Sequence, residues 1–460
     1  MSHADVDPGP AERESSPAEV RRVAISSYLG NTIEFYDFIL YGSAAALVFG
    51  PLFFSDLSPA LATVASFATL ASGYVARPLG GIVLGHFGDA IGRKKVLLLT
   101  MVLMGLASGA IGLLPTYEQI GVAAPLLLVL LRILQGFAVG GEWGGAVLLT
   151  AEHAPGRRRG FLVAIGQTGL ATGGLLSTVA MALVALLPAE QLFSWGWRLP
   201  FLVSFLLLGL GLYMRLRVSE SPVFRELENR PRPPRVPLVR IVRTPGLLLR
   251  SVAAALPSTV ATALFGTYMI SYAGVLGYSR PTILTSLCIA WAAAIVLLPL
   301  FGLLTDRIGR RPVFVFGAVS LAVVVYPAFL AVRTGSMLAL TAIMVFVSAI
   351  SSNACVSALA PLLSEMFPTS VRYTGVSMAY QLASLLAGLS PLVASSLVAG
   401  LGTSVGTTWI VIGTVAVGLG GAAVVWSMRD TSGSNLRTVG DPTRRPASPA
   451  TAVDAAEAHS

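Results

Sequence analysis

The sequence predicts an all-α integral membrane protein whose twelve transmembrane helices form two six-helix bundles related as parallel repeats. Three observations carry this prediction: the composition, the spacing of apolar stretches, and an internal repeat. Charged residues are 12% and apolar residues 55% of the 460 residues, and the mean hydropathy is +0.77. Soluble domains have about 25% charged residues, and disordered chains have low hydrophobicity. With 2 cysteines, a disulfide scaffold is excluded as well.

Each predicted span has about the 20 mostly apolar residues that cross a bilayer. Each is expected to be helical, because lipid offers a backbone no hydrogen bonds. The spans are 23–49, 59–84, 96–114, 123–149, 161–187, 198–214, 249–273, 282–304, 312–332, 337–363, 374–399 and 408–427. They divide the chain into an N-tail (1–22), an N-terminal bundle (23–214), a linker (215–248), a C-terminal bundle (249–427) and a C-tail (428–460). The C-tail is rich in Pro, Ala, Ser and Thr and is predicted to be disordered.

The distribution of positive charge predicts the orientation of these spans. Of the 31 basic residues, 26 lie in the tails, the linker and the loops on the same side of the membrane. By the positive-inside rule, both termini are expected in the cytoplasm of a plasma-membrane protein. The polar N-tail does not read as a signal peptide. The net charge of +9 is spread over short loops, so lipid, and not nucleic acid, is the expected partner.

Glycines in the fifth and twelfth spans are expected to allow close packing between helices, since small residues let membrane helices approach. They are Gly169, Gly173, Gly174, Gly418, Gly420 and Gly421.

Two motifs of the first half recur in the second. Gly85–Lys94 and Gly302–Arg311 both read G-x-x-x-D-x-I-G-R-basic, at an offset of 217 residues. Glu152-His153-Ala154-Pro155 is echoed by Glu365-Met366-Phe367-Pro368, at an offset of 213. Two echoes in corresponding loops indicate parallel six-helix halves. This is a plan of transporters that bind substrate at the membrane midplane between the halves.

The repeated segments are expected to hold a conformational latch, or else only turns and topology anchors. Glycine permits a tight turn, Asp can cap the following helix, and Arg can pair with acidic groups or carbonyls at a neighbouring helix end. For Glu152 and Glu365 a structural role is the simpler interpretation. The predicted latch residues are Gly85, Asp89, Gly92, Arg93 and Glu152, with Asp306, Arg307, Gly309, Arg310 and Glu365 in the second half.

These motifs make the chain resemble the major facilitator superfamily, over roughly residues 22–428. Further stretches resemble its metabolite:proton symporter family: 34–38 (EFYDF), 77–81 (RPLGG), 132–136 (RILQG), 140–143 (GGEW), 197–201 (WRLPF) and 219–222 (SESP). The region from Gly85 to Pro155 is most similar to shikimate transporters. The family also includes carriers of citrate, 2-oxoglutarate, aromatic acids, and proline or betaine. Ala90 departs from the signature loop, which usually has Arg there, and this puts part of the first-half latch in doubt.

Five residues of the types Asp, Glu, Lys and Arg fall well inside predicted spans, all in the first half: Glu34, Asp37, Arg77, Arg132 and Glu142. Each costs about 3 kcal/mol in lipid unless it faces a cavity or a partner. At a rise of about 1.5 Å per helical residue, Asp37 lies at a membrane depth similar to that of Arg132, and Glu34 at one similar to that of Arg77. Depth therefore allows Asp37 to pair with Arg132 and Glu34 to pair with Arg77. Purely structural ion pairs are the alternative, and Arg77 could also extend to the interface.

Glu34, Asp37 and Glu142 are therefore candidates for proton coupling. An anionic substrate needs a fixed cation, for which Arg132 is the first choice and Arg77 the second. Neutral polar residues inside the spans either line the pocket or form interhelical hydrogen bonds. They are Tyr41, Gln135, Gln167, Asn353, Tyr380 and Gln381, of which Tyr380 and Gln381 are the preferred contacts from the second half.

The function that the sequence predicts is a proton-coupled symporter, which imports a small organic acid by alternating access. Uptake of an osmolyte or zwitterion such as proline or betaine, or efflux, is the alternative. A monomer with a small-molecule substrate and protons as partners is expected. No P-loop or metal-ligand spacing is present in the sequence, so no cofactor or metal is predicted. The G-x-S-x-G match at Gly402–Gly406 is expected in a short outer loop, so an enzyme is not predicted.

Overall fold

The computed structural model describes residues 17–91, 93–140, 147–148, 150–151, 154, 158–217, 245–367 and 372–428. Side chains at several helix ends, including 85–91 and 93–95, lie outside this description.

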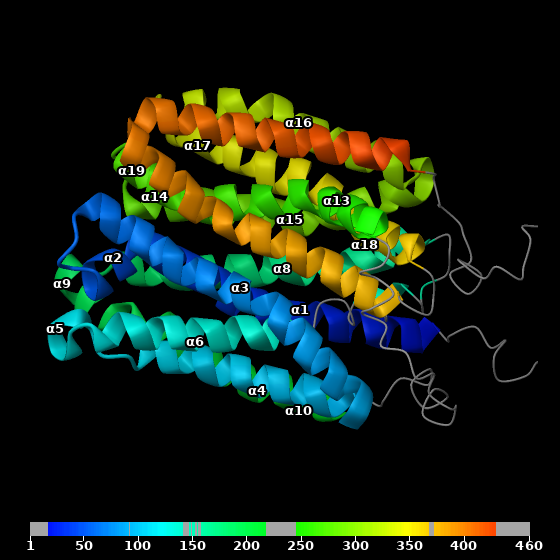
Figure 1. The fold of residues 1–460 in the computed structure, drawn as a ribbon, viewed down its shortest axis with the longest axis horizontal. Coiled ribbons are helices and arrows are strands. Elements are labelled where there is room, and N and C mark those ends of the chain that lie inside the picture. The colour runs from blue at the N-terminus through cyan, green and yellow to red at the C-terminus, as the bar shows by residue number, and fades with distance from the viewer. Residues whose placement is uncertain are drawn as a thin grey trace, which may run out of the picture.

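The N-terminal half is a bundle of long helices that run along one direction (Figure 1). Short helices lie at the end opposite to the start of α1. The long helices are α1 (Pro17–Leu47), α3 (Pro59–Ile91), α4 (Arg93–Gly112), α6 (Ala123–Val139), α8 (Arg159–Ala185) and α10 (Arg198–Arg217). The short elements are α2 (Phe49–Phe53), α5 (Tyr117–Ile120), α9 (Ala189–Gln191) and the π-helical turn η2 (Leu192–Gly196).

The C-terminal half repeats this arrangement with π-helical turns inside two of its spans. One span joins α13 (Pro245–Ala263), η3 (Leu264–Tyr268) and α14 (Met269–Val275). Two continuous helices follow, α15 (Arg280–Ile308) and α16 (Arg310–Val332). The next span joins α17 (Met337–Met344), η4 (Val345–Ser352) and α18 (Asn353–Met366). The last element, α19 (Arg372–Ser427), is broken at Gly402, where φ is 80°, into two arms that run in opposite directions (Figure 1).

The described residues thus provide all twelve expected spans. Eight segments are long and apolar enough to cross a membrane, and one of them, Thr374–Ser427, holds both arms of α19. The spans of α1, α4 and α6 complete the set. α1 begins and α19 ends at the same end of the molecule, as an even number of spans requires (Figure 1). This end is called the terminal end below.

The surface of the bundle is apolar, whereas many polar side chains are buried. Leu206, Leu338 and Trp426 are 75%, 79% and 61% exposed, while Glu34, Asp37 and Arg132 are 3%, 2% and 0% exposed. A soluble protein has the reverse pattern. The outer surface is therefore a lipid-facing surface, and the protein is a multi-pass membrane protein.

Glycines set the distance between the most closely packed helices. A Cβ atom added to Gly80 in α3 would collide with the Phe137 carbonyl of α6, and Gly169 and Gly173 of α8 meet the backbone of α1 in the same way. Gly174 lies against Trp291 of α15. In the last span, Gly418 and Gly421 pack against neighbouring helices as expected, and the expectation was wrong for Gly420, which has nothing within 4 Å of an added Cβ.

Helix boundaries differ from expectation at the repeated motifs. Gly85 and Asp89 lie within α3, and Gly302 and Asp306 lie within α15, so they are not loop residues. The turn itself is made by Gly309, whose φ of 93° suits glycine. Likewise, residues 403–406 continue α19 as a helix, and the expected loop of the G-x-S-x-G match shrinks to Gly402.

The glycine contacts predict that Gly80→Ala lowers the thermal unfolding midpoint of the protein in detergent. The added methyl group collides with the Phe137 carbonyl, and overpacking of this kind lowers the free energy of unfolding by about 1–3 kcal/mol. Gly420→Ala is the matched control, because its methyl group meets open space and alanine favours a helix. Equal midpoints for the two variants would contradict the close approach of α3 and α6.

Candidate functional site

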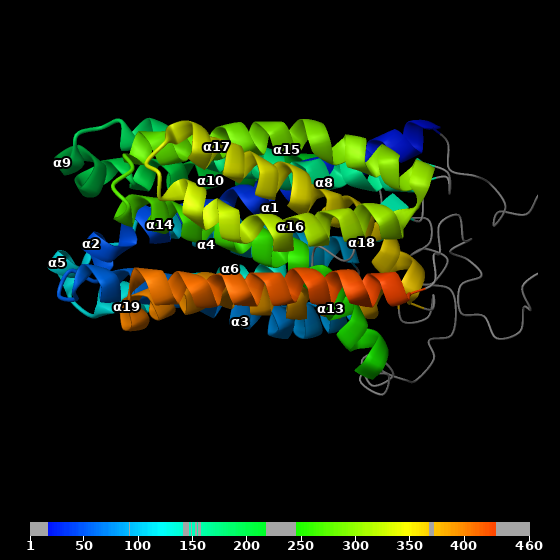
Figure 2. The ribbon, with the colours of Figure 1, turned by 90° about the horizontal axis from the view of Figure 1, so that it is seen from above.

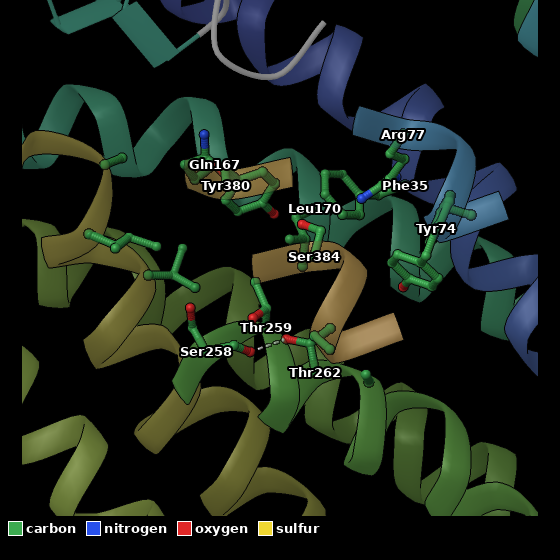
Figure 3. A pocket seen from close by; sticks show the side chains of 16 residues that line it. Phe35, Tyr74, Arg77, Gln167, Leu170, Ser258, Thr259, Thr262, Tyr380 and Ser384 are labelled. Carbon is green, nitrogen blue, oxygen red and sulfur yellow. Dashed lines mark hydrogen bonds between the residues drawn. The ribbon is translucent and has the colours of Figure 1, made fainter. Parts of the chain in front are cut away.

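A cavity lies between the two halves, with about 610 Å³ of empty space between its lining residues, part of which is open to solvent (Figure 3). The halves meet around it through two main helix pairs, α8 with α15 and α3 with α19 (Figure 2). Its N-terminal wall consists of Phe35, Phe38, Tyr74, Arg77, Gln167 and Leu170. Its C-terminal wall consists of Ser258, Thr259, Thr262, Ala263, Val356, Leu359, Ala360, Tyr380, Ser384 and Ala387. This set is called the central cavity below.

Arg77 is the one charged side chain among the residues described as lining the central cavity. It is 3% exposed, and its guanidinium carbon lies 4.0 Å from the centre of the Phe38 ring and 5.1 Å from that of Tyr74. Its Nη2 lies 3.9 Å from Glu34 Oε1, so the pairing that depth allowed is present and the side chain does not extend to the interface. Within the described residues, Nε and Nη2 have no hydrogen-bond partner. The cavity therefore faces a buried cation with donors to spare.

Arg132 lies behind the cavity wall, inside the N-terminal bundle. It is fully buried, and Nη1 donates to Gln135 Oε1 at 3.0 Å. Gln135 Nε2 in turn donates to Ser108 Oγ at 2.6 Å, and Ser108 lies beside Asp37. The Asp37 carboxylate also accepts a hydrogen bond from Ser204 of α10. Within the described residues Asp37 and Arg132 form no direct ion pair, so that expectation was wrong and the connection between them is indirect.

The Phe38 ring separates these two arginines. The guanidinium carbon of Arg132 lies 4.1 Å from the centre of the Phe38 ring and 4.2 Å from that of Tyr41. Two cations therefore share one aromatic ring, and a desolvated cation–π contact is worth about 2 kcal/mol. Since Phe38 lines the cavity and Arg132 does not, Arg77 replaces Arg132 as the cation that a substrate can reach.

The other predicted polar residues divide between the cavity wall and interhelical hydrogen bonds. Tyr380 and Gln167 line the cavity. The expectation that Tyr41, Gln135, Asn353 and Gln381 line it was wrong. Tyr41 donates to Thr69 Oγ1 at 2.7 Å, Asn353 to the Ala294 carbonyl at 3.0 Å, and Gln381 to the Gly140 carbonyl at 3.0 Å. The Gln381 bond joins the two halves. Glu142 lies outside the described residues.

Sequence reasoning missed most of the C-terminal wall. Ser258, Thr259 and Thr262 line the cavity from α13, and the same reasoning passed over Ser384 and the aromatic Tyr74, Phe35 and Phe38. A signal existed for the α13 residues, because they are polar positions one and four residues apart in an apolar span. No comparable signal marks the aromatic residues, which look like ordinary apolar positions.

A second polar cluster joins the halves near the terminal end. The Asp306 carboxylate accepts hydrogen bonds from the backbone N–H groups of Gly160 and Phe161, each at 2.9 Å, and so caps α8 of the other half. Arg310 Nη1 donates to the same carboxylate at 3.0 Å and to the Thr305 carbonyl at 2.8 Å. The expectation that Asp306 caps the helix following it was therefore wrong: it stabilises the positive end of a helix in the partner half.

Glu365 completes this cluster. Its Oε1 lies 3.2 Å from Arg159 Nη1 and 3.7 Å from Arg310 Nη2, and both arginines are buried. Arg159, which sequence reasoning did not single out, belongs to α8, whereas Glu365 belongs to α18. The Arg159–Glu365 pair therefore crosses between halves, whereas the Arg310–Glu365 pair lies within the C-terminal half. The four residues Arg159, Asp306, Arg310 and Glu365 are called the inner latch below.

Of the remaining latch candidates, the structure describes the surroundings of Arg307 and Gly309. Arg307 was expected to keep the second-half latch, but its side chain is exposed, and in the described part of the chain Arg310 binds Asp306 instead. Gly309 contributes the turn between α15 and α16. In the first half, Gly85 and Asp89 belong to α3 and Arg93 begins α4. Their side-chain environment, Gly92 and Glu152 lie outside the described residues.

The halves also touch at the end opposite to the inner latch. A Cβ atom added to Gly42 would lie 2.9 Å from Thr267 Oγ1, and the rings of Phe67 and Tyr268 are 6.4 Å apart. Arg280 lies 5.2 Å from the centre of the Phe193 ring. The central cavity therefore lies between contacts at both ends. Two repeated bundles around such a midplane cavity define a secondary transporter that works by alternating access.

Comparisons with known proteins agree with this class. Residues 23–231 match the family model "Sugar (and other) transporter", and residues 282–454 match "Major Facilitator Superfamily". The chain is 38% identical to the shikimate transporter of Escherichia coli (strain K12) over 395 residues, which cover 85% of this chain and 90% of that one. It is 34% identical to the proline/betaine transporter of the same strain over 392 residues, which cover 83% and 78%.

Solved structures show the same fold. A proton:xylose symporter bound to 6-bromo-6-deoxy-D-glucose superposes with a TM-score of 0.70 at 20% identity, covering 92% of this chain and 99% of the other. A D-xylose–proton symporter gives 0.67 at 21% identity, covering 90% and 99%. The chain belongs to the major facilitator superfamily, and within it to the metabolite:proton symporter family. It is a transporter and not an enzyme.

The inner latch predicts that Asp306→Ala exposes the start of α8. Without the carboxylate, the amides of Gly160 and Phe161 lose their acceptor, and their hydrogen exchange should rise about tenfold or more. Hydrogen–deuterium exchange with mass spectrometry measures this directly. Arg307→Ala is the control, because the Arg307 side chain is exposed. Unchanged exchange in the Asp306 variant would remove Asp306 from the latch.

Proposed function

We propose that this protein is a proton-coupled symporter which imports a small organic acid across the plasma membrane. One observation carries the proposal: a single buried guanidinium, that of Arg77, faces a cavity with no other described charged lining residue, and two of its nitrogens have no hydrogen-bond partner in the part of the chain that the structure describes. A carboxylate fits such a group, because a guanidinium binds it through paired charge-assisted hydrogen bonds. The relatives that carry shikimate and proline or betaine transport compounds with one carboxyl group, which supports this proposal.

The coupling that we propose is a competition for Arg77. In the substrate-free cavity the Glu34 carboxylate balances the guanidinium from 3.9 Å. A bound substrate carboxylate takes over that balance, and Glu34 is then stabilised by accepting a proton, because two carboxylates next to one cation repel each other. Proton and substrate therefore favour each other's binding. Asp37 is a second candidate for the proton, since its carboxylate is connected with Arg132 through Ser108 and Gln135. Glu142 stays a prediction from the sequence.

The conformational step that we propose breaks the inner latch. Two of its contacts cross between halves at the terminal end, the Arg159–Glu365 pair and the bonds from the Gly160 and Phe161 amides to Asp306, and water can replace these bonds when that end opens. The positive-inside rule supports a cytoplasmic location for this end and for both termini. The cavity is complete within one chain, which supports a monomeric transporter.

Uptake of a zwitterion such as proline or betaine is the second candidate. The observation that favours it is the presence of aromatic rings, those of Phe35, Phe38, Tyr74 and Tyr380, beside the Glu34–Arg77 pair. Aromatic faces attract alkylammonium groups, and a carboxylate of the same molecule would bind Arg77. Relatives at 34% identity are named for such substrates.

Arg77→Gln is expected to abolish transport in proteoliposomes. Uptake of labelled shikimate, 2-oxoglutarate, an aromatic acid and glycine betaine should be measured with and without an inward proton gradient. For the compound that is carried, we expect a loss on the order of 100-fold, because glutamine keeps donors but not the charge. Arg307→Gln is the matched control, since Arg307 is exposed outside the cavity. Transport that survives Arg77→Gln, or uptake that a protonophore does not reduce, rejects the proposal.

Glu34→Gln is expected to separate exchange from accumulation. The amide mimics a permanently protonated Glu34, so substrate still binds Arg77 but no proton is released with it. Exchange of internal for external substrate should remain, whereas uphill uptake driven by a proton gradient should fall at least tenfold. Glu190→Gln, on the exposed α9, serves as the control. Full proton-driven accumulation by the Glu34 variant would assign coupling to another carboxylate.

A further inference from the structure

Three hydroxyl side chains of α13 form one face of the central cavity, opposite to Arg77 (Figure 3). They are Ser258, Thr259 and Thr262, called the hydroxyl wall below. Proline stands directly before them at Pro257 in the same helix, so the wall sits at a point where the helical hydrogen-bond pattern is interrupted. In the proposed cycle described above, these side chains have no part.

Each hydroxyl proton of this wall is already committed to a backbone carbonyl of α13. Ser258 donates to the Ala255 carbonyl at 3.2 Å, and Thr259 to the same carbonyl at 3.0 Å. Thr262 donates to the Ser258 carbonyl at 2.9 Å and lies 3.4 Å from Ser352 Oγ. A hydroxyl has one proton and two lone pairs. The wall therefore presents oxygen lone pairs to the cavity, which accept hydrogen bonds.

Arg77 and the hydroxyl wall thus have opposite hydrogen-bonding character. Arg77 on the N-terminal side has donors only, two of which have no partner among the described residues. The hydroxyl wall on the C-terminal side offers acceptors. A ligand that satisfies both walls carries an anionic acceptor at one end and O–H or N–H donors at the other.

We infer that the substrate is a hydroxylated monocarboxylate, whose carboxylate binds Arg77 and whose hydroxyl protons are accepted by Ser258, Thr259 and Thr262. This inference rests on the proposed function and narrows its substrate class. A dicarboxylate is disfavoured at the hydroxyl wall, because a second carboxylate there would face three hydroxyl groups that already donate their protons to backbone carbonyls. A quaternary betaine is disfavoured for a different reason, since it has no O–H or N–H group to donate.

Binding to the purified full-length protein tests the inference with a matched pair of probes. Shikimate and cyclohex-1-ene-1-carboxylate share a ring and a carboxylate and differ only in three hydroxyl groups. Titration calorimetry should give a Kd about 100-fold lower for shikimate, as three net hydrogen bonds would produce. Quinate and gluconate are further hydroxylated probes, and succinate and glycine betaine represent the disfavoured classes.

Variants of the wall assign the difference to these side chains. In the combined variant Ser258→Ala, Thr259→Val, Thr262→Val, the preference for shikimate over its deoxy counterpart should fall below threefold, while the deoxy compound binds as before. Ser251→Ala is the control: Ser251 is on the same helix and donates to the Leu247 carbonyl at 2.9 Å, but it does not line the cavity. If the combined variant is not monodisperse, the three single variants replace it, each with a several-fold loss of preference.

The outcomes separate this inference from the proposed function. Equal binding of shikimate and the deoxy compound, tighter binding of succinate or betaine, or binding of none of the hydroxylated probes overturns the inference. In each of these cases the proposed function still stands if a carboxylate is taken up with protons and Arg77→Gln abolishes that uptake. Conversely, failure of proton-driven uptake for every acid rejects the proposed function, whatever the hydroxyl wall prefers.

Discussion

Two arginine side chains buried against one phenylalanine ring set the main constraint on this structure. Arg77 and Arg132 lie 4.0 and 4.1 Å from the centre of the Phe38 ring, within a bundle whose outer surface is apolar. Each buried cation needs nearby carboxylates, amides or aromatic faces to offset lost hydration. Glu34 and the polar chain from Gln135 to Asp37 meet this need. The buried charge at the central cavity therefore belongs to the N-terminal half, whereas the described lining residues of the C-terminal half are uncharged.

The contacts between the two halves at the terminal end differ in kind from those around the central cavity. At the terminal end, the inner latch uses a carboxylate that caps a helix of the opposite half, together with ion pairs between Arg159, Arg310 and Glu365. Water can take the place of each of these bonds, since donors and acceptors of this kind bond to water as well. Around the central cavity the walls are aromatic and hydroxyl groups, which suit weak, reversible binding. The terminal end and the central cavity thus join the halves through different side chains.

The position of Arg77 links these two regions. It lies on α3, which packs against the first arm of α19, and it faces the wall that carries Tyr380 and Ser384. A ligand that bridges Arg77 and α13 would draw the two halves together around itself. Closure of the cavity would then follow from contacts that exist only with substrate bound, which is the condition under which a ligand can shift a conformational equilibrium.

The membrane class, the twelve spans, the repeat of the two halves and the burial of Glu34, Asp37, Arg77 and Arg132 could all be predicted before the fold was known. The length of apolar stretches, the cost of a charge in lipid and the repeated motifs can be read directly from the order of amino acids. Depth along each helix allowed the pair of Glu34 with Arg77, which is present, and equally the pair of Asp37 with Arg132, which is absent among the described residues, so depth alone could not choose between them. Which polar side chains face the cavity could be seen only in the folded protein. Arg132, Gln135 and Asn353 form hydrogen bonds elsewhere and are not among the lining residues. The cavity is lined instead by Ser258, Thr259 and Thr262. Which side of a helix faces the cavity depends on how the helix is rotated about its axis and on which helices it packs against. Both are set by contacts with residues far away in the chain, such as the contact of Gly80 in α3 with α6.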